Sequence, residues 1–451
     1  MPRPARKLWS ALLAALALGC AACAPSESPP NLLVLLVDDV GRELLSVYAE
    51  GPTAEALPRT PNIERLAAAG VRFERAWAYP LCSPTRATIQ TGRYGFRTGV
   101  GGVIRPDGPA LPLDEVTLPE LLESALPGQY RTGAFGKWHL GNGGVGGLEA
   151  PRHAGYQHFA GSLGNLVGNQ SYTDWDRVED GLLQRSSAYA TSDAVDACLR
   201  FVQSSEQPWL AYVAFQAAHA PLHVPPAELL DEGRAPGDEP LEQVHAMVEA
   251  LDRELGRLLD GLGEDALERC VVVFASDNGT SPLAHGLGAE EGRGKGTLWE
   301  GGLSVPLIVA GAGVAEPGRS SAALVSTVDL YATLAEMVGV DARAHLPAGR
   351  VLDSISFAPV LAQAGPGSPR KTLYAEIFHP NGHAPQGAWR AVRGKRYKLL
   401  VREPSGQRFL YDLEEDPGER RDLLGRGTPS QRTQGAYARL SRELSLLMDD
   451  L

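Results

Sequence analysis

Several apolar segments of this 451-residue chain run directly into polar or charged side chains. The clearest is 31–37, a near-continuous apolar run that Asp38 and Asp39 follow at once. Such runs are typical of parallel strands that are buried on both faces. The pattern recurs at 131–139, 209–219 and 270–278. Because open α/β sheets bind ligands at the carboxyl ends of their strands, we expect an α/β fold with a functional site along one sheet edge.

Segments with helical periodicity alternate with these strands. They predict an α/β fold in which helices cover both faces of the sheet. The helices are expected at 60–70, 118–124, 190–203, 241–262 and 326–338, and a further strand at 305–310.

The pattern of predicted helices and strands changes near residue 371. Short strand-like segments separated by turn residues occupy 389–392, 396–401 and 408–413, which predicts a small antiparallel sheet. We therefore expect a large α/β domain over 31–368 and a C-terminal α+β subdomain over 369–451.

Overall composition narrows the class of protein. Hydrophobic residues make up 43% and charged residues 21% of the chain, as in folded globular proteins. The formal net charge of −12 argues against a nucleic-acid partner.

The N-terminal residues predict export. A basic start precedes the apolar stretch 8–19, and small residues then lead to Cys20 and Cys23. Residues 1–23 are interpreted as a signal peptide of the lipoprotein type, and 24–30 as a tether. An ordinary secretion signal cut near residues 22–24 is the alternative. The expected location is the periplasm or the cell surface, with membrane contact only through the N-terminal lipid anchor.

Two pairs of oxygen donors follow two of the expected strands: Asp38 with Asp39, and Asp277 with Asn278. Adjacent carboxylates repel each other, and a divalent cation neutralises them. Oxygen ligands without cysteine or histidine favour Ca²⁺ or Mg²⁺. Each pair alone could equally cap a helix or a turn.

A third segment, Cys82-Ser83-Pro84-Thr85-Arg86, places a cysteine in what reads as a polar turn. It resembles the C-x-P-[S/T/A]-R signature of the sulfatase family, in which the cysteine is oxidised to formylglycine. The resemblance extends over nearly the full mature chain, through further motifs in order at 36–39, 136–141, 218–221, 276–279, 294–302, 397–399 and 410–413.

The resemblance implies a fold, an activity and roles for single residues. The fold would be the alkaline-phosphatase-like sandwich, a mixed sheet between layers of helices with a small C-terminal antiparallel sheet. The activity would be hydrolysis of a sulfated carbohydrate or an aryl sulfate. One Ca²⁺ would be bound by Asp38, Asp39, Asp277, Asn278 and the modified Cys82. Arg86 would hold the formylglycine hydrate. Lys137 and Lys295 would contact the sulfate. His139 would assist breakdown of the covalent intermediate, and His219 would protonate the leaving alcohol. A formylglycine-generating enzyme would be the maturation partner.

These residue types suit the reaction. A sulfate ester is an anion, so cations and a metal lower the electrostatic barrier to a nucleophile. A histidine that donates a proton to the leaving alkoxide contributes typically about 10²–10⁴ in rate.

Some features depart from the family pattern or leave alternatives open. Gln90 stands where leucine or methionine is usual, and Ser304 where many members carry arginine.

A phosphonate or phosphodiester hydrolase on the same scaffold, and an inactive surface binding protein, are the alternatives to a sulfatase. Trp175, Trp389, His158 and His383 could line a sugar subsite, but packing is the favoured interpretation for each.

Overall fold

The structure is a computed structural model that describes residues 28–49, 57–231, 236–284, 292–365, 367–383, 387–425 and 429–449. The predicted signal peptide and most of the predicted tether lie outside these residues, so both stay predictions. Among the helices of the described ranges, none combines the length and the apolar character that crossing a bilayer requires.

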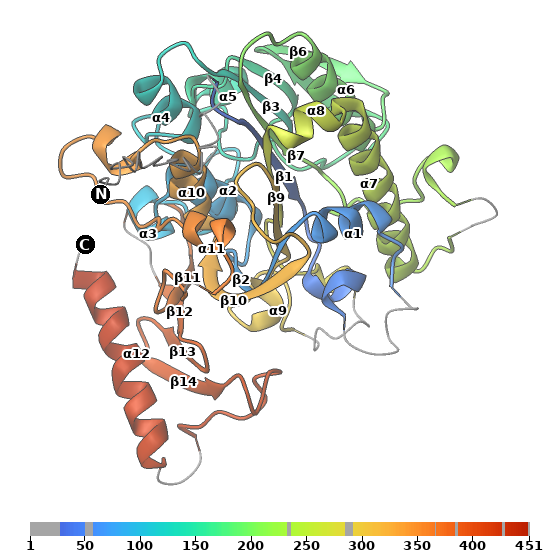
Figure 1. Cartoon of the computed structure of the whole chain (residues 1–451). Helices are drawn as coiled ribbons and strands as arrows, with labels where there is room; N and C mark the ends of the chain where they lie inside the picture. The colour runs from blue at the N-terminus through green and yellow to red at the C-terminus, as the bar shows by residue number, and fades with distance from the viewer. Residues whose placement is uncertain are drawn as a thin grey trace, which may run out of the picture.

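One large mixed sheet forms the centre of the molecule (Figure 1). The central strand β1 (Asn31–Val37) pairs in parallel with β7 (Trp209–Ala214) and β8 (Cys270–Ser276). The full order of its ten strands is β10 (Arg319–Ser326), β2 (Gly70–Trp77), β9 (Leu307–Gly311), β8, β1, β7, β3 (Arg131–Lys137), β4 (His158–Ser162), β5 (Trp175–Glu179) and β6 (Leu182–Ser186). The expected α/β fold is confirmed, and so are the strands β1, β3, β7, β8 and β9.

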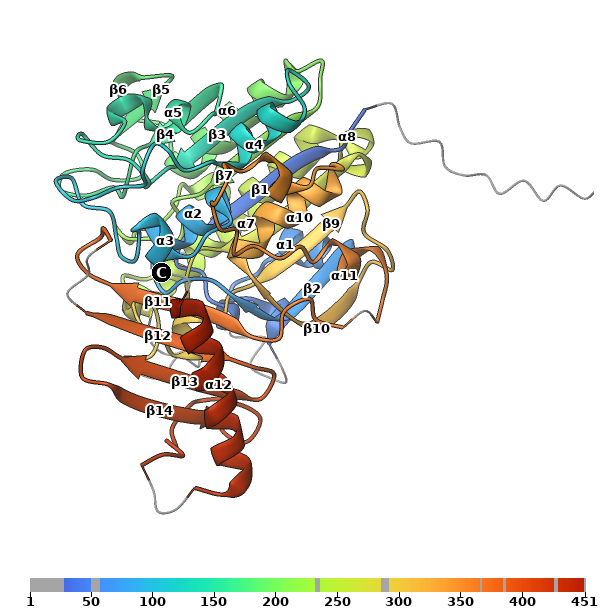
Figure 2. The same ribbon diagram turned by 90° about the vertical axis from the view of Figure 1, so that its left-hand side faces the viewer.

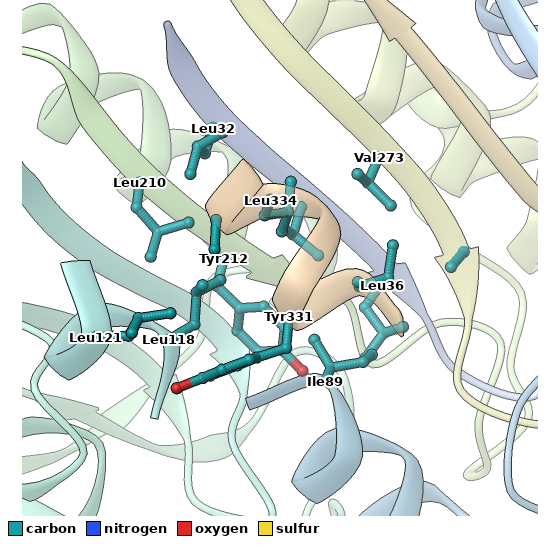
Figure 3. Packing of buried hydrophobic residues seen from close by; sticks show 14 of the residues in the cluster. Leu32, Leu36, Ile89, Leu118, Leu121, Leu210, Tyr212, Val273, Tyr331 and Leu334 are labelled. Atoms are coloured by element: carbon teal, nitrogen blue, oxygen red, sulfur yellow. The ribbon is translucent and has the colours of Figure 1, made fainter. Parts of the chain in front are cut away.

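Alternate residues of β1 pack against two different layers of helices, which explains its continuous apolar run. Leu33 and Leu35 lie in the hydrophobic core that the sheet forms with α1 (Pro61–Ala68), α6 (Ala190–Gln203) and α7 (Pro240–Leu262). Leu32 and Leu36 lie in the opposite core with Tyr212 and Leu334, as Figure 3 shows. The helices of that second layer are α2 (Cys82–Thr91), α4 (Leu118–Ala125) and α10 (Leu330–Met337).

Shorter α-helices of the described ranges occur along the chain between the longer helices and the strands. They are α3 (Gly95–Thr98), α5 (Ala150–His153), α8 (Glu264–Glu268), α9 (Glu300–Leu303) and α11 (Ala358–Ala362).

A second, antiparallel sheet forms the C-terminal part of the chain (Figure 2). Its order is β11 (Leu373–Phe378), β12 (Ala388–Arg393), β13 (Tyr397–Arg402) and β14 (Gln407–Asp412). The helix α12 (Gln431–Asp449) contacts β12 and β13. The predicted antiparallel sheet is confirmed. The domain boundary between residues 368 and 369 stays a prediction.

The structure corrects the interpretation of the segment around Cys82. This residue begins α2 and is 1% exposed, whereas the sequence suggested a polar turn. Proline is tolerated in the first turn of a helix because the missing N–H has no partner there, so Pro84 does not prevent the helix. Thr85 stabilises the turn before it, since its Oγ1 accepts a hydrogen bond from the Tyr79 N–H at 2.9 Å.

Candidate active site

The carboxyl ends of β1, β8 and β3 bring most of the predicted site residues together. Asp38 and Asp39 follow β1, and Asp277 and Asn278 follow the neighbouring β8, whose Ser276 is paired with Val37. Lys137 is the last residue of β3, and His139 comes two residues later. Cys82 and Arg86 belong to the first turns of α2, His219 follows β7, and Lys295 lies in the loop before α9.

Arg86 connects the two strand ends. Its guanidinium lies 2.7 Å from Asp277 Oδ2 and 3.1 Å from Asp38 Oδ2, and it donates a hydrogen bond to the Lys137 carbonyl at 2.6 Å. Arg86, Asp38 and Asp277 are all 0% exposed. A buried charge is retained only when it is paired and hydrogen-bonded. Arg86 thus holds both carboxylates in place.

Two lysines complete the pairing. Lys137 Nζ forms an ion pair with Asp38 Oδ2, and Lys295 Nζ with Asp39 Oδ1. Burial opposes a charge on Lys295, but the Asp39 carboxylate outweighs it and raises the pKa of Lys295 well above its usual value. Both amines therefore point into one small region between the strand ends and Cys82.

Two buried oxygens of this region lack hydrogen-bond partners in the described part of the chain: Asp38 Oδ1 and Asn278 Oδ1. Ligand atoms of Asp38, Asp39 and His219 lie within 4.8 Å of one another. Unpartnered buried oxygens are costly, and a cation satisfies them. The residues therefore fit a divalent ion with oxygen ligands. The cluster also includes His219, which the sequence suggested as a proton donor rather than a ligand.

The pKa values of the carboxyl groups agree with this fit. Burial alone would raise the pKa of Asp38, but the neighbouring positive charges, led by that of Lys137, hold it well below its usual range. Burial and the negative charge of Asp38 raise the pKa of Asp277 to about 6. The cations of the chain thus leave Asp277 only partly compensated, and a metal ion would lower its pKa.

Cys82 and His139 form a second contact group. Cys82 Sγ lies 3.2 Å from His139 Nδ1. Burial raises the pKa of the Cys82 thiol, and it lowers the pKa of His139 well below its usual value, with a further contribution from Lys137. Burial also lowers the pKa of His219, whose Nδ1 donates a hydrogen bond to the Ala220 carbonyl at 2.7 Å. Both imidazoles therefore favour the neutral form.

Two of the site residues have strained backbones. Asp39 has a φ of 62° and His139 a φ of 59°. Residues other than glycine adopt this left-handed conformation at a cost, and such residues gather at functional sites. The sequence does not reveal this left-handed conformation, because it is occupied by aspartate and histidine and not by glycine.

The unusual Gln90 has a polar partner that the sequence did not suggest. Its amide group donates a hydrogen bond to the Tyr156 hydroxyl at 2.9 Å, and both residues are buried. Ser304, the other departure, accepts a hydrogen bond from Arg42 at 3.2 Å. Both residues therefore have a side-chain hydrogen-bond partner in the fold.

Of the four candidate subsite residues, Trp175 and His158 pack as expected. Trp175 is 2% exposed and its Nε1 donates to the Ala188 carbonyl, while His158 Nδ1 lies 2.7 Å from Asp180 Oδ2. Trp389 differs, because it lines a pocket between the C-terminal sheet and the loop that follows Lys295. His383 is exposed, so packing is not confirmed for it.

Comparison with known proteins identifies the family of the chain. The family model described as Sulfatase matches residues 30–340, and the model described as N-sulphoglucosamine sulphohydrolase, C-terminal, matches residues 293–447. The chain is 33% identical to bovine (Bos taurus) arylsulfatase A, over 92% of this chain and 87% of the relative. It is 32% identical to the N-acetylgalactosamine-6-sulfatase of the dog (Canis lupus familiaris), over 78% and 70% of the two chains.

Solved structures share the fold. The crystal structure of Ps i-CgsB has a TM-score of 0.78 at 24% identity and covers 94% of this chain and 93% of its own. A protein solved in complex with D-glucosamine-2-N,6-O-disulfate has a TM-score of 0.72 at 21% identity, over 94% and 99% of the two chains. Because the Sulfatase model and relatives above 30% identity both span most of it, the chain belongs to the sulfatase family and is a sulfuric ester hydrolase.

Proposed function

We propose that this hydrolase acts through formylglycine formed at Cys82, with one Ca²⁺ held by Asp38, Asp39, Asp277, Asn278 and the modified residue 82. The observation that carries the proposal is the position of Cys82. It lies buried at the start of α2, 3.2 Å from His139 Nδ1, and beside a pair of strand ends with two unpartnered oxygens.

The unmodified thiol is poorly suited to this site. Only the thiolate is nucleophilic, and burial raises the pKa of Cys82. Since the side chain is 1% exposed, a maturation enzyme would reach it before the chain folds. A formylglycine-generating enzyme acting on the unfolded segment is therefore the partner that we propose.

The two added groups supply distinct chemistry. A hydrated aldehyde at residue 82 would supply two hydroxyl groups on one carbon, one as the nucleophile toward sulfur and one whose deprotonation would allow sulfate to leave. Ca²⁺ held by the carboxylates would supply positive charge that offsets the negative charge of the ester.

The side chains of this protein bind the anion and move protons. Lys137 and Lys295 carry their positive charges beside residue 82 and would bind the sulfate oxygens. The neutral Nδ1 of His139 can accept a proton from a hydroxyl at position 82. Because the His219 Nδ1–H is donated to the Ala220 carbonyl, only the imidazolium form carries a proton on Nε2, the atom that would protonate the leaving alkoxide. That Arg86 also holds the hydrate stays a prediction.

The substrate would be a sulfated carbohydrate or an aryl sulfate. Relatives named for both kinds of substrate support this class: arylsulfatase A and N-acetylgalactosamine-6-sulfatase. A protein with the same fold was solved in complex with D-glucosamine-2-N,6-O-disulfate. We further propose that residues 1–23 direct export to the periplasm or the cell surface and that a lipid at the new N-terminus anchors the enzyme there.

Peptide mass spectrometry tests the proposal. The protein is produced together with a formylglycine-generating enzyme, and the peptide containing Cys82 is compared with that containing Cys198, a buried cysteine outside the motif. We expect conversion of Cys82 to the aldehyde while Cys198 remains a thiol. An active preparation in which Cys82 is entirely unmodified would contradict the proposed nucleophile.

A further inference from the structure

The turn that carries His219 is tied by backbone hydrogen bonds to the end of the central strand β1. The turn follows β7, and the His219 N–H donates to the Gln216 carbonyl at 2.9 Å. The Asp38 N–H donates to the Ala217 carbonyl at 3.0 Å, and the Ala218 N–H donates to the Asp38 carbonyl at 2.6 Å. The backbone of a candidate metal ligand therefore supports the turn that carries the proposed proton donor.

A tyrosine from another part of the chain also holds this turn. Tyr172 lies between β4 and β5, and its Oη donates to the Gln216 carbonyl at 2.7 Å and to the His219 carbonyl at 2.8 Å. These carbonyls are the first and the last of the turn, so one hydroxyl group bridges both of its ends. No other hydrogen bond to the His219 carbonyl is found among the residues that the structure describes.

Tyr172 is itself held firmly. It is 2% exposed, and its carbonyl accepts the N–H of Ala190, the first residue of α6, at 2.8 Å. The centre of its ring lies 4.2 Å from that of His223 and 5.7 Å from that of Tyr189. Burial raises the pKa of Tyr172 well above its usual value, so the hydroxyl remains a donor wherever a histidine titrates.

Proton transfer depends on where the His219 imidazole lies. Its Nδ1 donates to the carbonyl of the next residue, Ala220, so the orientation of the ring follows the local backbone. A displacement of about 1 Å in a reacting group can lower a rate by about 10²-fold. A hydroxyl group that fixes the backbone of His219 therefore bears on the step in which the leaving alkoxide is protonated.

We propose that Tyr172 is a positioning residue for His219: its hydroxyl group fixes the turn from which the imidazole reaches the leaving oxygen. The inference rests on the proposed function, in which His219 is the proton donor. It adds to that function a residue outside the motifs of the sequence, because Tyr172 acts through two backbone carbonyls and not on the substrate.

Two aryl esters that differ in their need for a proton donor test the proposal. Phenol is as weak an acid as a tyrosine side chain, with a pKa of about 10, so phenyl sulfate depends on protonation of its leaving group. 4-Nitrophenol is a much stronger acid, so 4-nitrophenyl sulfate depends on it less. In Tyr172→Phe, kcat/KM should fall by about tenfold for phenyl sulfate and by less than about threefold for 4-nitrophenyl sulfate. A general defect of the fold would lower both values alike.

The measured quantity is the ratio of kcat/KM for 4-nitrophenyl sulfate to that for phenyl sulfate. Tyr130→Phe is the matched control and should keep the native ratio, because it also removes a buried tyrosine hydroxyl that donates to a carbonyl, that of Pro30. His219→Ala should raise the ratio more than Tyr172→Phe does, and adding Tyr172→Phe to His219→Ala should not change it further. A native ratio in Tyr172→Phe, or a further change in the double variant, would overturn the inference.

Two additional measurements keep the test decisive. If Tyr172→Phe does not fold, His223→Leu removes a ring that packs on Tyr172 and should raise the ratio, whereas a native ratio there would overturn the inference. If the native protein hydrolyses neither ester, modification of His219 by diethyl pyrocarbonate is followed by peptide mass spectrometry. Its rate should rise at least about threefold in Tyr172→Phe, because the turn opens more often, and an unchanged rate would contradict the proposal. Failure of the proposed function would instead appear as a native ratio in His219→Ala.

Discussion

The strand ends of the large sheet and the base of the C-terminal sheet each bury a group of opposite charges, but the two groups are completed differently. In the C-terminal ion cluster, Lys398 Nζ lies 3.1 Å from Glu300 Oε1 and 2.8 Å from Glu419 Oε1, while Arg393 lies 2.7 Å from Glu300 Oε2. Burial would raise the pKa of Glu300, yet Arg393 and Lys398 lower it to about 2. Glu300 is thus compensated by the chain itself, and Glu419 keeps its ion pair with Lys398 although burial raises the pKa of Glu419.

In the cluster at the strand ends, the described residues do not pair every buried oxygen. Asp38 Oδ1 and Asn278 Oδ1 have no partner among the described residues, and the pKa of Asp277 is raised to about 6. Both clusters are buried, so the difference is not a matter of solvent. The ion pairs of the C-terminal ion cluster join two parts of the fold. The cluster at the strand ends instead leaves oxygen atoms available for an added cation.

The largest effect is expected from Cys82→Ala. The variant should lose at least about 10³-fold in kcat, because the proposed nucleophile is absent. Its melting temperature should change little, since removing one sulfur leaves only a small cavity. Cys198→Ala removes a buried thiol from α6 and should stay active. Substantial turnover by Cys82→Ala would contradict the assigned nucleophile.

Asp277→Ala should lose Ca²⁺ and activity together. It also leaves Arg86 with a single carboxylate partner, which we expect to cost about 3–5 kcal/mol of unfolding free energy. Metal content by mass spectrometry and chemical denaturation measure the two effects. Asp260→Ala, at an exposed position of α7, is the matched control and should bind Ca²⁺ normally. Full metal occupancy in Asp277→Ala would count against the proposed site.

Lys398→Met breaks the other cluster and should separate stability from catalysis. Removing this fully buried amine leaves Glu419 without its cation, at an expected cost of about 3–5 kcal/mol. Well below the melting temperature, kcat should stay within about threefold of the native value. Lys371→Met, at an exposed position, should affect neither. A loss of Ca²⁺ in Lys398→Met would show that the two clusters are not independent.

The smallest expected effect concerns a lone buried carboxyl group, Glu376, in β11. Burial raises its pKa from 4.5 to about 7, although Arg390 lies 3.8 Å away. Because the folded state raises the pKa of this carboxyl group, the fold favours its protonated form. The resulting contribution to the free energy of unfolding is fully present below about pH 4.5 and is lost as the pH rises to about 7. Between pH 5 and pH 8, Glu376→Gln should therefore gain up to about 3 kcal/mol of stability relative to the native protein.

Thermal unfolding at several pH values measures this difference. The glutamine keeps an oxygen that can accept the Phe96 N–H, as Glu376 Oε1 does at 2.7 Å. Parallel pH profiles for the two proteins would show that Glu376 stays ionised in the fold.

Part of the fold was predictable because its signal is local. The central strands read as apolar runs, and α6 was predicted with the same bounds that the structure has. The strands β2, β4, β5, β6, β10 and β11 were not predicted. Among them, β6 is an exposed edge strand whose residues show no apolar alternation. The helix at Cys82 was mistaken for a turn because Ser83 and Pro84 are common in both.

The sequence by itself determined which side chains lie at the ends of parallel strands, and through its motifs the family to which the chain belongs. This follows from short-range pattern and from the topology of parallel sheets. Only the tertiary structure decided how their charges are paired: that Arg86 connects Asp38 to Asp277, and that Gln90 is satisfied by Tyr156. The pocket at Trp389 likewise depends on where the second sheet meets the loop after Lys295. Contacts between residues far apart in the chain depend on packing, which the local pattern does not encode.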